Sequence, residues 1–132
     1  MKKNLFVLFV LSAVILTACG KSAAATPTLE PVPAEFAGKT NPFGPDAAAD
    51  GAKIFEVNCA PCHGPQGHGD GPAGAALDPK PKKLSEFVPT VSDDFLFWRI
   101  NTGKPGTSMA PWAGILTEDQ IWQVISFLHT LK

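Results

Sequence analysis

Apolar residues recur at helical spacing in three parts of the chain, and these repeats predict three helices. The clearest repeat follows Thr117, whose Thr-Glu-Asp-Gln sequence is a capping box that closes on Gln120. The apolar positions beyond it keep to the i, i+3, i+4, i+7 rule, with two further aromatic residues widening the stripe. These positions are Ile121, Val124, Ile125 and Leu128, with Trp122 and Phe127. We therefore expect a C-terminal amphipathic helix with a broad buried face.

A first helix is predicted to begin near Asp46, which can serve as its N-cap. The residues spaced for one face of this helix are Ala48, Gly51, Ala52 and Phe55. Glycine inside a helix costs about 1 kcal/mol relative to alanine, so Gly51 indicates a close contact with another helix.

A middle helix is predicted over about 93–102. Ser92 is its expected N-cap, Asp93 and Asp94 favour the positive end of its dipole, and Gly103 stops it. Residues 64–90 between the first two helices are dense in glycine and proline, and strand signals are few. A long irregular loop in so small a domain argues against an ordinary apolar core. The predicted fold is all-α, with three main helices and long loops. Something other than an ordinary apolar core must hold these loops in place.

The N-terminus reads as a targeting segment. Lys2 and Lys3 precede an apolar run over 5–16, which is shorter than the about 20 residues that span a bilayer and suits a secretory signal. The run ends in Leu16-Thr17-Ala18-Cys19-Gly20, which resembles the bacterial lipoprotein signal. That resemblance implies that residues 1–18 are removed and that Cys19 carries diacylglycerol. The alternative is an ordinary signal peptide in which Cys19 is incidental.

Residues 19–45 are predicted to form a tether, since five prolines between small residues favour extended chain. Phe36 and Phe43 do not suit a pure spacer. We expect them to lie on the adjacent domain, and docking on a partner is the alternative. The predicted organisation is thus a signal peptide over 1–18, a lipidated tether over 19–45 and a domain over 46–132.

Composition narrows the possible functions. The chain has 132 residues, with 11 basic and 12 acidic side chains and a formal net charge of −1. This length allows one domain with a tail. Backbone binding of nucleic acid needs a basic excess, so the charge excludes that class. The cysteines are Cys19, Cys59 and Cys62, too few for a disulfide scaffold.

The sequence Cys59-Ala60-Pro61-Cys62-His63 is the attachment motif of c-type haem. Two thiols at this spacing reach the two porphyrin vinyl groups on one side, and the adjacent imidazole meets the iron from the same face. A thioredoxin-like dithiol would need a βαβ context, which the pattern lacks. A zinc site would need further Cys or His ligands.

Met109 is the candidate for the opposite iron ligand. It is the one methionine left after signal removal, and it lies in a loop framed by glycine and proline rather than on a helical core face. A thioether is a soft ligand that favours the reduced state. His68 is a rival, but it follows His63 too closely to reach the other porphyrin face. His129, near the end of the last helix, is expected to be solvated or to neutralise the helix dipole.

Residues 46–132 resemble a class I monohaem cytochrome c. The resemblance implies that Cys59 and Cys62 form the thioethers and that His63 is the proximal ligand. It implies too that the Pro72 carbonyl accepts the Nδ1–H of His63. It further implies that the first helix crosses the last one, with Gly51 and Phe55 against Phe127. The common Met-Pro is Met-Ala-Pro here, and the tether is no part of the family core.

Three side chains are candidates for the haem surroundings: Trp98, Arg99 and Trp112. Arginine can pair with a propionate and a tryptophan N–H can donate to one, while core packing is the alternative for both tryptophans. Lys80, Lys82 and Lys83 form a small basic cluster that is either a solvated loop or a weak docking patch for an acidic partner.

With both axial positions filled, the iron has no open site, so the expected protein transfers single electrons and is not an enzyme. We expect a carrier in a respiratory or photosynthetic chain, with one covalent haem c and redox proteins as donor and acceptor. It would be lipid-anchored on the outer face of the bacterial cytoplasmic membrane. We expect no nucleic-acid partner and no small-molecule substrate. The alternatives are a fixed haem subunit of a quinol-oxidising or oxidase complex and a haem-based sensor.

Overall fold

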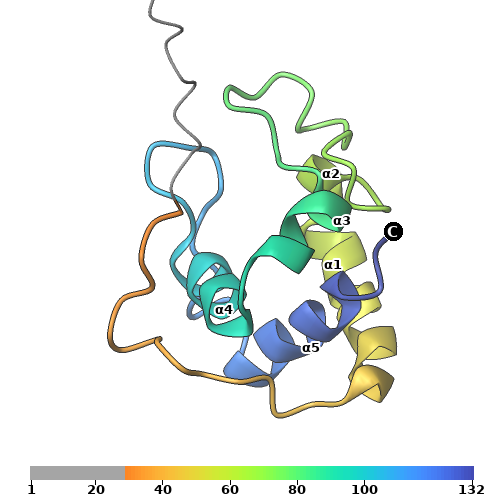
Figure 1. Cartoon of the computed structure of the whole chain (residues 1–132). Coiled ribbons are helices and arrows are strands. Elements are labelled where there is room, and N and C mark those ends of the chain that lie inside the picture. The colour runs from red at the N-terminus through yellow and green to blue at the C-terminus, as the bar shows by residue number, and fades with distance from the viewer. Residues whose placement is uncertain (1–28) are drawn as a thin grey trace, which may run out of the picture.

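The fold is built from short helices joined by long loops (Figure 1). The computed structural model describes residues 29–132, so the predicted signal segment and Cys19 lie outside the described residues. The 3₁₀ turns are η1 (Pro45–Ala47) and η2 (Val88–Thr90). The α-helices are α1 (Ala48–Asn58), α2 (Ala60–His63), α3 (Leu84–Phe87), α4 (Asp93–Thr102) and α5 (Glu118–Leu128). Within 29–132 the β-structure amounts to one isolated bridge between Ala113 and Leu116, which agrees with the predicted all-α class.

Helix α5 forms the centre of the domain, as its apolar stripe predicted. The capping box is present: Thr117 Oγ1 accepts from the Gln120 amide at 3.2 Å, and the Thr117 amide donates to Gln120 Oε1 at 2.9 Å. The buried face comprises Ile121, Trp122, Val124, Ile125 and Leu128. These side chains join Phe55, Phe97 and Val88 in one hydrophobic core, so α5 is the element on which the others pack.

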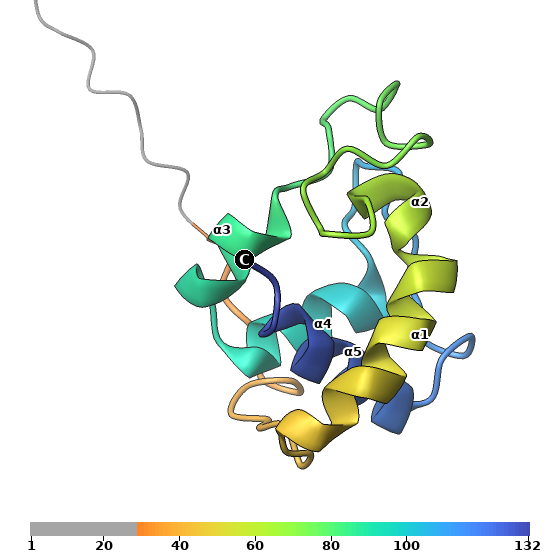
Figure 2. The same cartoon turned by 90° about the vertical axis from the view of Figure 1, so that its right-hand side faces the viewer.

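Helix α1 crosses α5 with its backbone almost touching (Figure 2). A Cβ atom built on Gly51 would lie 1.9 Å from the Gln123 carbonyl oxygen. One turn further along, the rings of Phe55 and Phe127 have centroids 5.0 Å apart. Both features confirm the expected crossing of the first and last helices. Only glycine allows this approach, which accounts for its presence in a helix despite its poor propensity.

The helix boundaries agree with the predictions in the middle of the chain and differ at the start. Helix α4 begins after Ser92 and ends before Gly103, as expected, although the Ser92 hydroxyl donates to the Asp94 carboxylate rather than capping the helix. The predicted cap at Asp46 is wrong. Pro45 begins the 3₁₀ turn that takes in Asp46, so the N-cap of α1 is Ala47, which makes no side-chain bond.

Part of the predicted irregular loop is helical. Within 64–90, α3 and η2 bury Leu84 and Val88 in the core. Each of these elements is too short to show a periodic pattern, which is why the sequence did not reveal them.

Residues 29–45 differ from a free spacer because they lie along the helical domain. The Asn41 side chain donates to the Trp122 carbonyl at 3.1 Å and to Ser126 Oγ at 3.0 Å. Phe36 and Phe43 pack against the core, as expected, and the Phe36 ring centroid is 6.2 Å from that of Phe97. In the described part of the chain, no helix has the length and apolar character to cross a membrane.

The crossing at Gly51 yields a stability prediction. Gly51→Ala places a methyl group on the Gln123 carbonyl, so the free energy of unfolding of the holoprotein is expected to fall by about 1–3 kcal/mol, despite the better helix propensity of alanine. The measurement is denaturant unfolding. Gly44→Ala is the matched control, because a Cβ at Gly44 meets no atom within 4 Å. Equal stability of the two variants would contradict the account.

Candidate cofactor site

The Cys-x-x-Cys-His segment forms a single tight turn at the C-terminal end of α1. The amides of Cys62 and His63 both donate to the Cys59 carbonyl, at 3.1 Å and 2.8 Å. Residues three and four apart on such a turn share a face. The turn therefore presents both thiols and the imidazole from one short piece of backbone, as the motif predicted.

The two cysteines are free thiols. Both are half-buried, and no disulfide joins them. Burial raises the pKa of Cys59 to about 12, with a smaller contribution from Cys62, so this thiol is protonated at neutral pH. Among residues 29–132, no group of three or more His, Cys, Asp and Glu side chains is arranged to hold a metal ion.

His63 is a half-buried neutral imidazole whose Nδ1 atom is buried and unpartnered. Burial lowers its pKa, and a hydrogen bond to the Lys82 backbone opposes that effect. Nδ1 is buried and has no hydrogen-bond partner within 29–132. Metals are ligated by the neutral imidazole, and the ring nitrogen that does not bind the metal normally donates its proton to a fixed partner. Nδ1 lacks such a partner within 29–132.

The loop after the turn packs its backbone onto the turn itself. A Cβ on Gly71 would lie 2.5 Å from the Ala60 and Pro61 carbonyl oxygens, and one on Gly74 would lie 2.3 Å from that of Cys62. Pro72, between them, is exposed, and the expected bond from His63 Nδ1 to its carbonyl is not formed. The backbone of Lys82 approaches the imidazole instead, because residues 81–84 are fastened to Gly67 and Gly69. A role for Pro72 in cofactor binding stays a prediction.

Met109 sits in a loop that is closed by a backbone bond of its own and is tied to α4 at its far end. Before it, the Lys104 amide donates to the Met109 carbonyl at 2.9 Å; after it, the Trp112 amide donates to the Ile100 carbonyl at 3.2 Å. The Met109 side chain is half-buried against the core. Figures 1 and 2 show this loop at the same end of the molecule as α2 and the 64–83 loop. The structure thus brings Met109 to the end that carries the cysteine turn.

The rival histidines lie elsewhere. His68 is exposed and lines a surface cavity of about 450 Å³ together with Phe127 and Leu131. His129 caps the C-terminus of α5, and its Nε2 lies 2.8 Å from Asp93 Oδ1. The expectation that His129 is a helix-end residue agrees with this position.

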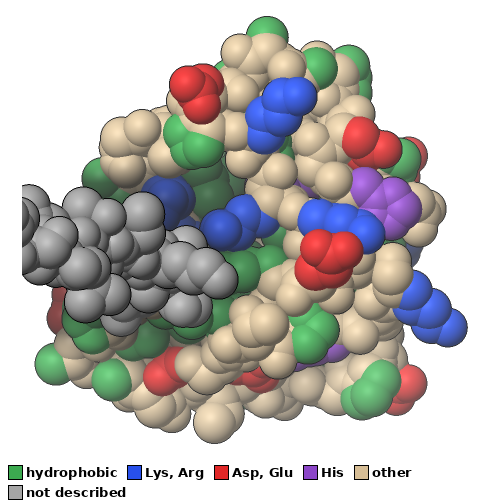
Figure 3. Space-filling model, turned by 45° about the horizontal axis from the view of Figure 1, so that its top comes forward, with side chains coloured by type: hydrophobic (Ala, Val, Ile, Leu, Met, Phe, Trp, Pro, Cys, Tyr) green, Lys and Arg blue, Asp and Glu red, His purple; other side chains and the backbone are tan. Residues whose placement is uncertain are grey.

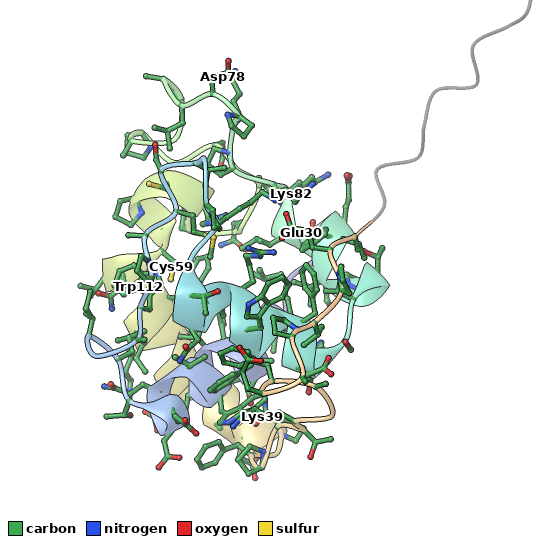
Figure 4. The ribbon with its side chains drawn as sticks, turned by 90° about the vertical axis from the view of Figure 1, so that its left-hand side faces the viewer. Glu30, Lys39, Cys59, Asp78, Lys82 and Trp112 are labelled. Atoms are coloured by element: carbon green, nitrogen blue, oxygen red, sulfur yellow. The ribbon has the colours of Figure 1, made fainter. Side chains whose placement is uncertain are left out.

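Trp98, Arg99 and Trp112 were the other side chains predicted to surround the cofactor. Trp112 packs against the core and Trp98 is half-buried. Figure 4 shows Cys59 and Trp112 on one side of the domain, with Glu30 and Lys82 across from them. Arg99 is buried and lies over the Trp98 ring, with its Cζ atom 4.1 Å from the centroid.

Glu30 is a residue of this region that the sequence analysis missed. Arg99 Nη2 donates to Glu30 Oε2 at 2.5 Å, and the guanidinium holds the pKa of Glu30 below its ordinary value. Glu30 stands in the proline-rich segment, where composition favours a spacer. A buried arginine on an apolar helix needs a carboxylate or carbonyl partner. The presence of Arg99 on such a helix was therefore the one signal from which a partner such as Glu30 could have been predicted.

Figure 3 looks onto this end of the molecule and shows a hollow with an apolar floor, flanked by basic side chains. The features at this end are two free thiols on one turn, an imidazole with a buried, unpartnered Nδ1 and a thioether in an anchored loop. Together they fit a covalently attached haem, for which both the ligands and the apolar surroundings are required. They define the class: a c-type cytochrome domain.

Comparison with known proteins gives the family. Residues 46–128 match the family model described as "Cytochrome C oxidase, cbb3-type, subunit III". Because the match spans most of the chain, the protein belongs to this family of c-type cytochromes. Membership of this family implies covalently bound haem c, and its members are electron-transfer cytochromes.

Individual relatives come from two kinds of protein. The chain is 36% identical over 89 residues to the cbb3-type cytochrome c oxidase subunit FixP of Rhizobium etli, covering 64% of this chain and 30% of that one. It is 34% identical over 80 residues to cytochrome c6 of Synechococcus elongatus, covering 61% and 85%. The chain therefore spans less than a third of the oxidase subunit but most of the small cytochrome.

A solved structure shows the same fold. A chain of the Kuenenia stuttgartiensis reducing HAO-like protein complex Kustc0457/Kustc0458 superposes with a TM-score of 0.59 at 25% sequence identity. The match covers 69% of this chain and 47% of that one.

Covalent attachment is testable directly. Because the motif turn offers two free thiols, haem is expected to stay with the denatured polypeptide through acid–acetone extraction and to give a c-type pyridine haemochrome. The variant lacking both thiols, Cys59→Ala with Cys62→Ala, is the control and is expected to lose its haem. Extraction of haem from the unmodified chain would contradict the thioether assignment.

Proposed function

We propose that this protein is a lipid-anchored one-electron carrier of a respiratory or photosynthetic chain. Cys59 and Cys62 would attach the haem, and His63 and Met109 would supply the two protein ligands to its iron. The observation that supports this most strongly is the motif turn, where two free thiols adjoin the half-buried imidazole of His63. The diacylglycerol on Cys19 places the domain on the outer face of the bacterial cytoplasmic membrane.

The axial pair accounts for the type of chemistry. Haem c, when bound, supplies the one-electron Fe(III)/Fe(II) couple. The neutral imidazole of His63 is a good nitrogen donor, and the thioether of Met109 is a soft donor that favours the reduced state. Two protein ligands leave no coordination position for a substrate. Electron transfer without bond making is therefore the function that this site supports, and a ligand-binding sensor would require Met109 to leave.

Arg99, Trp98 and Trp112 complete the proposed surroundings. Arg99 donates to the Gly103 carbonyl and to Glu30, which leaves some of its five N–H donors for a haem propionate. The indole N–H groups of Trp98 and Trp112 are further candidate donors. Pro72 remains a proposed contact on the His63 side.

The proposed partners are redox proteins that donate and accept single electrons. The basic cluster at Lys80, Lys82 and Lys83 offers a weak docking patch, although Lys83 is paired with Glu86 at 2.7 Å. Docking through this cluster would be screened by salt.

A fixed subunit of a quinol-oxidising or oxidase complex is the second candidate, because the matching family is named for an oxidase subunit and one relative is FixP. The proposal of an electron carrier is favoured because the aligned region spans 85% of the small cytochrome c6 of Synechococcus elongatus. Co-purification with other membrane proteins in mild detergent would favour the fixed subunit.

The axial assignment predicts the effect of Met109→Ala. Loss of the thioether opens an iron position, so the reduced variant is expected to bind carbon monoxide rapidly and to have a lower reduction potential. The unmodified chain is expected to bind it only weakly. Ser108→Ala, at the exposed neighbouring position, is the control that keeps the ligand. An unchanged ferric spectrum in Met109→Ala would transfer the role to another side chain.

The anchor predicts the effect of Cys19→Ser. This change removes the acylation site, so the protein is expected either to be released as a redox-competent cytochrome or to be held by an uncut signal peptide. The complementary measurement inserts a specific protease site after Ala25 in the lipidated chain. Cleavage is expected to free an intact haem domain. A cleaved domain that stays on membranes after a high-salt wash would contradict the carrier and support the fixed subunit.

A further inference from the structure

The ion pair between Arg99 and Glu30 joins the N-terminal segment to the redox end of the domain. Arg99 is the one charged side chain classed as buried within 29–132, at 8% exposure. Its Nη2 donates to Glu30 Oε2 at 2.5 Å, and its Nη1 donates to the Gly103 carbonyl at 3.1 Å. One guanidinium thus connects a carboxylate at the start of the described chain with the backbone at the end of α4.

Gly103 begins the turn that holds Met109. Its φ of +67° suits glycine, and a Cβ there would lie 2.5 Å from the Met109 carbonyl oxygen. The next residue, Lys104, donates its amide to that same carbonyl at 2.9 Å, and its Nζ lies 3.9 Å from Glu30 Oε1. Glu30 therefore holds two consecutive residues of this turn, one through Arg99 and the other directly.

We propose that Glu30 is a positioning residue for Met109. By fixing Arg99 and Lys104, it keeps the turn after α4 closed and so keeps the thioether in its place. The proposal rests on the proposed function, in which Met109 is an iron ligand. It gives the segment between the predicted anchor and the domain a role in the redox site beyond that of a spacer.

The effect of losing Glu30 is expected to be local. The far end of the segment keeps its own attachments, because Asn41 binds α5 and the Gly38 amide donates to Asp94 at 2.8 Å. Figure 4 shows Glu30 and Lys39 at opposite ends of the segment's path along the domain. Without the carboxylate, Arg99 loses a charge-assisted partner and holds the Gly103 carbonyl less firmly. The turn then opens more often while the fold persists.

The test uses the full haem-loaded chain with Glu30→Gln and imidazole as the probe. Imidazole binds ferric iron only when Met109 has left, and it is neutral, so the lost charge does not itself attract or repel it. The apparent imidazole affinity is expected to rise about 2- to 30-fold, the range typical of changes that act through a contact network. Amide hydrogen exchange at Lys104 is expected to accelerate by a similar factor. Glu35→Gln, an exposed carboxylate in the same segment, is expected to change neither quantity.

Two further variants separate this proposal from the axial assignment. In a Met109→Ala background, Glu30→Gln is expected to add nothing to imidazole binding, because there is no ligand left to position. If Met109→Ala alone binds imidazole like the unmodified chain, the axial assignment fails. If Met109→Ala opens the iron but Glu30→Gln leaves imidazole affinity unchanged, the positioning role fails, even where the reduction potential shifts.

If Glu30→Gln does not fold, Glu30→Asp provides a second test of the positioning role. Glu30→Asp keeps the charge and shortens its reach, so it is expected to raise the imidazole affinity in the same direction by a smaller factor. Unchanged imidazole affinity in a Glu30→Asp protein whose Lys104 amide exchanges faster would overturn the proposal.

Discussion

The crossing of α1 over α5 is the contact on which the rest of the domain depends. At Gly51 the two backbones meet so closely that no side chain fits between them. This contact fixes the direction of α1, whose last turn runs directly into the motif residues. Behind it, Phe55 and Phe127 anchor the crossing in the core. The helix–helix contact therefore sets the direction from which the chain enters the turn that carries the thiols and His63.

The loops at the cofactor end are held by backbone contacts more than by apolar packing. Gly71 and Gly74 let the 64–83 loop lie on the carbonyls of the motif turn, and Gly103 lets the Met109 loop close against α4. A small domain with such loops buries little apolar surface of its own. A covalently attached apolar cofactor would add buried apolar surface that the chain alone lacks.

The sequence predicted those parts of the structure that depend on local pattern. The stripe and capping box of α5, the bounds of α4 and the close contact at Gly51 all follow from spacing and propensity, and the structure confirms them. The cap at Asp46 was wrong because Pro45 starts a turn one step earlier. The ion pair between Glu30 and Arg99 joins residues that are far apart in the chain, and no local pattern records such a pair. Proline content correctly indicated that residues 29–45 form no long helix, but it carries no information on what they touch.

The central claim is that Met109 faces the haem iron, and carbon-13 labelling of the methionine methyl groups tests it most directly. The chain has two methionines, and Met1 is removed with the predicted signal, so the mature reduced protein is expected to show one methyl signal. If the Met109 sulfur ligates low-spin ferrous haem, the adjoining methyl group would experience the porphyrin ring current, which would move its proton resonance far upfield. The account predicts one such upfield resonance, which disappears in Met109→Ala. A Met109 methyl signal at the ordinary position of an unbound methionine would contradict it.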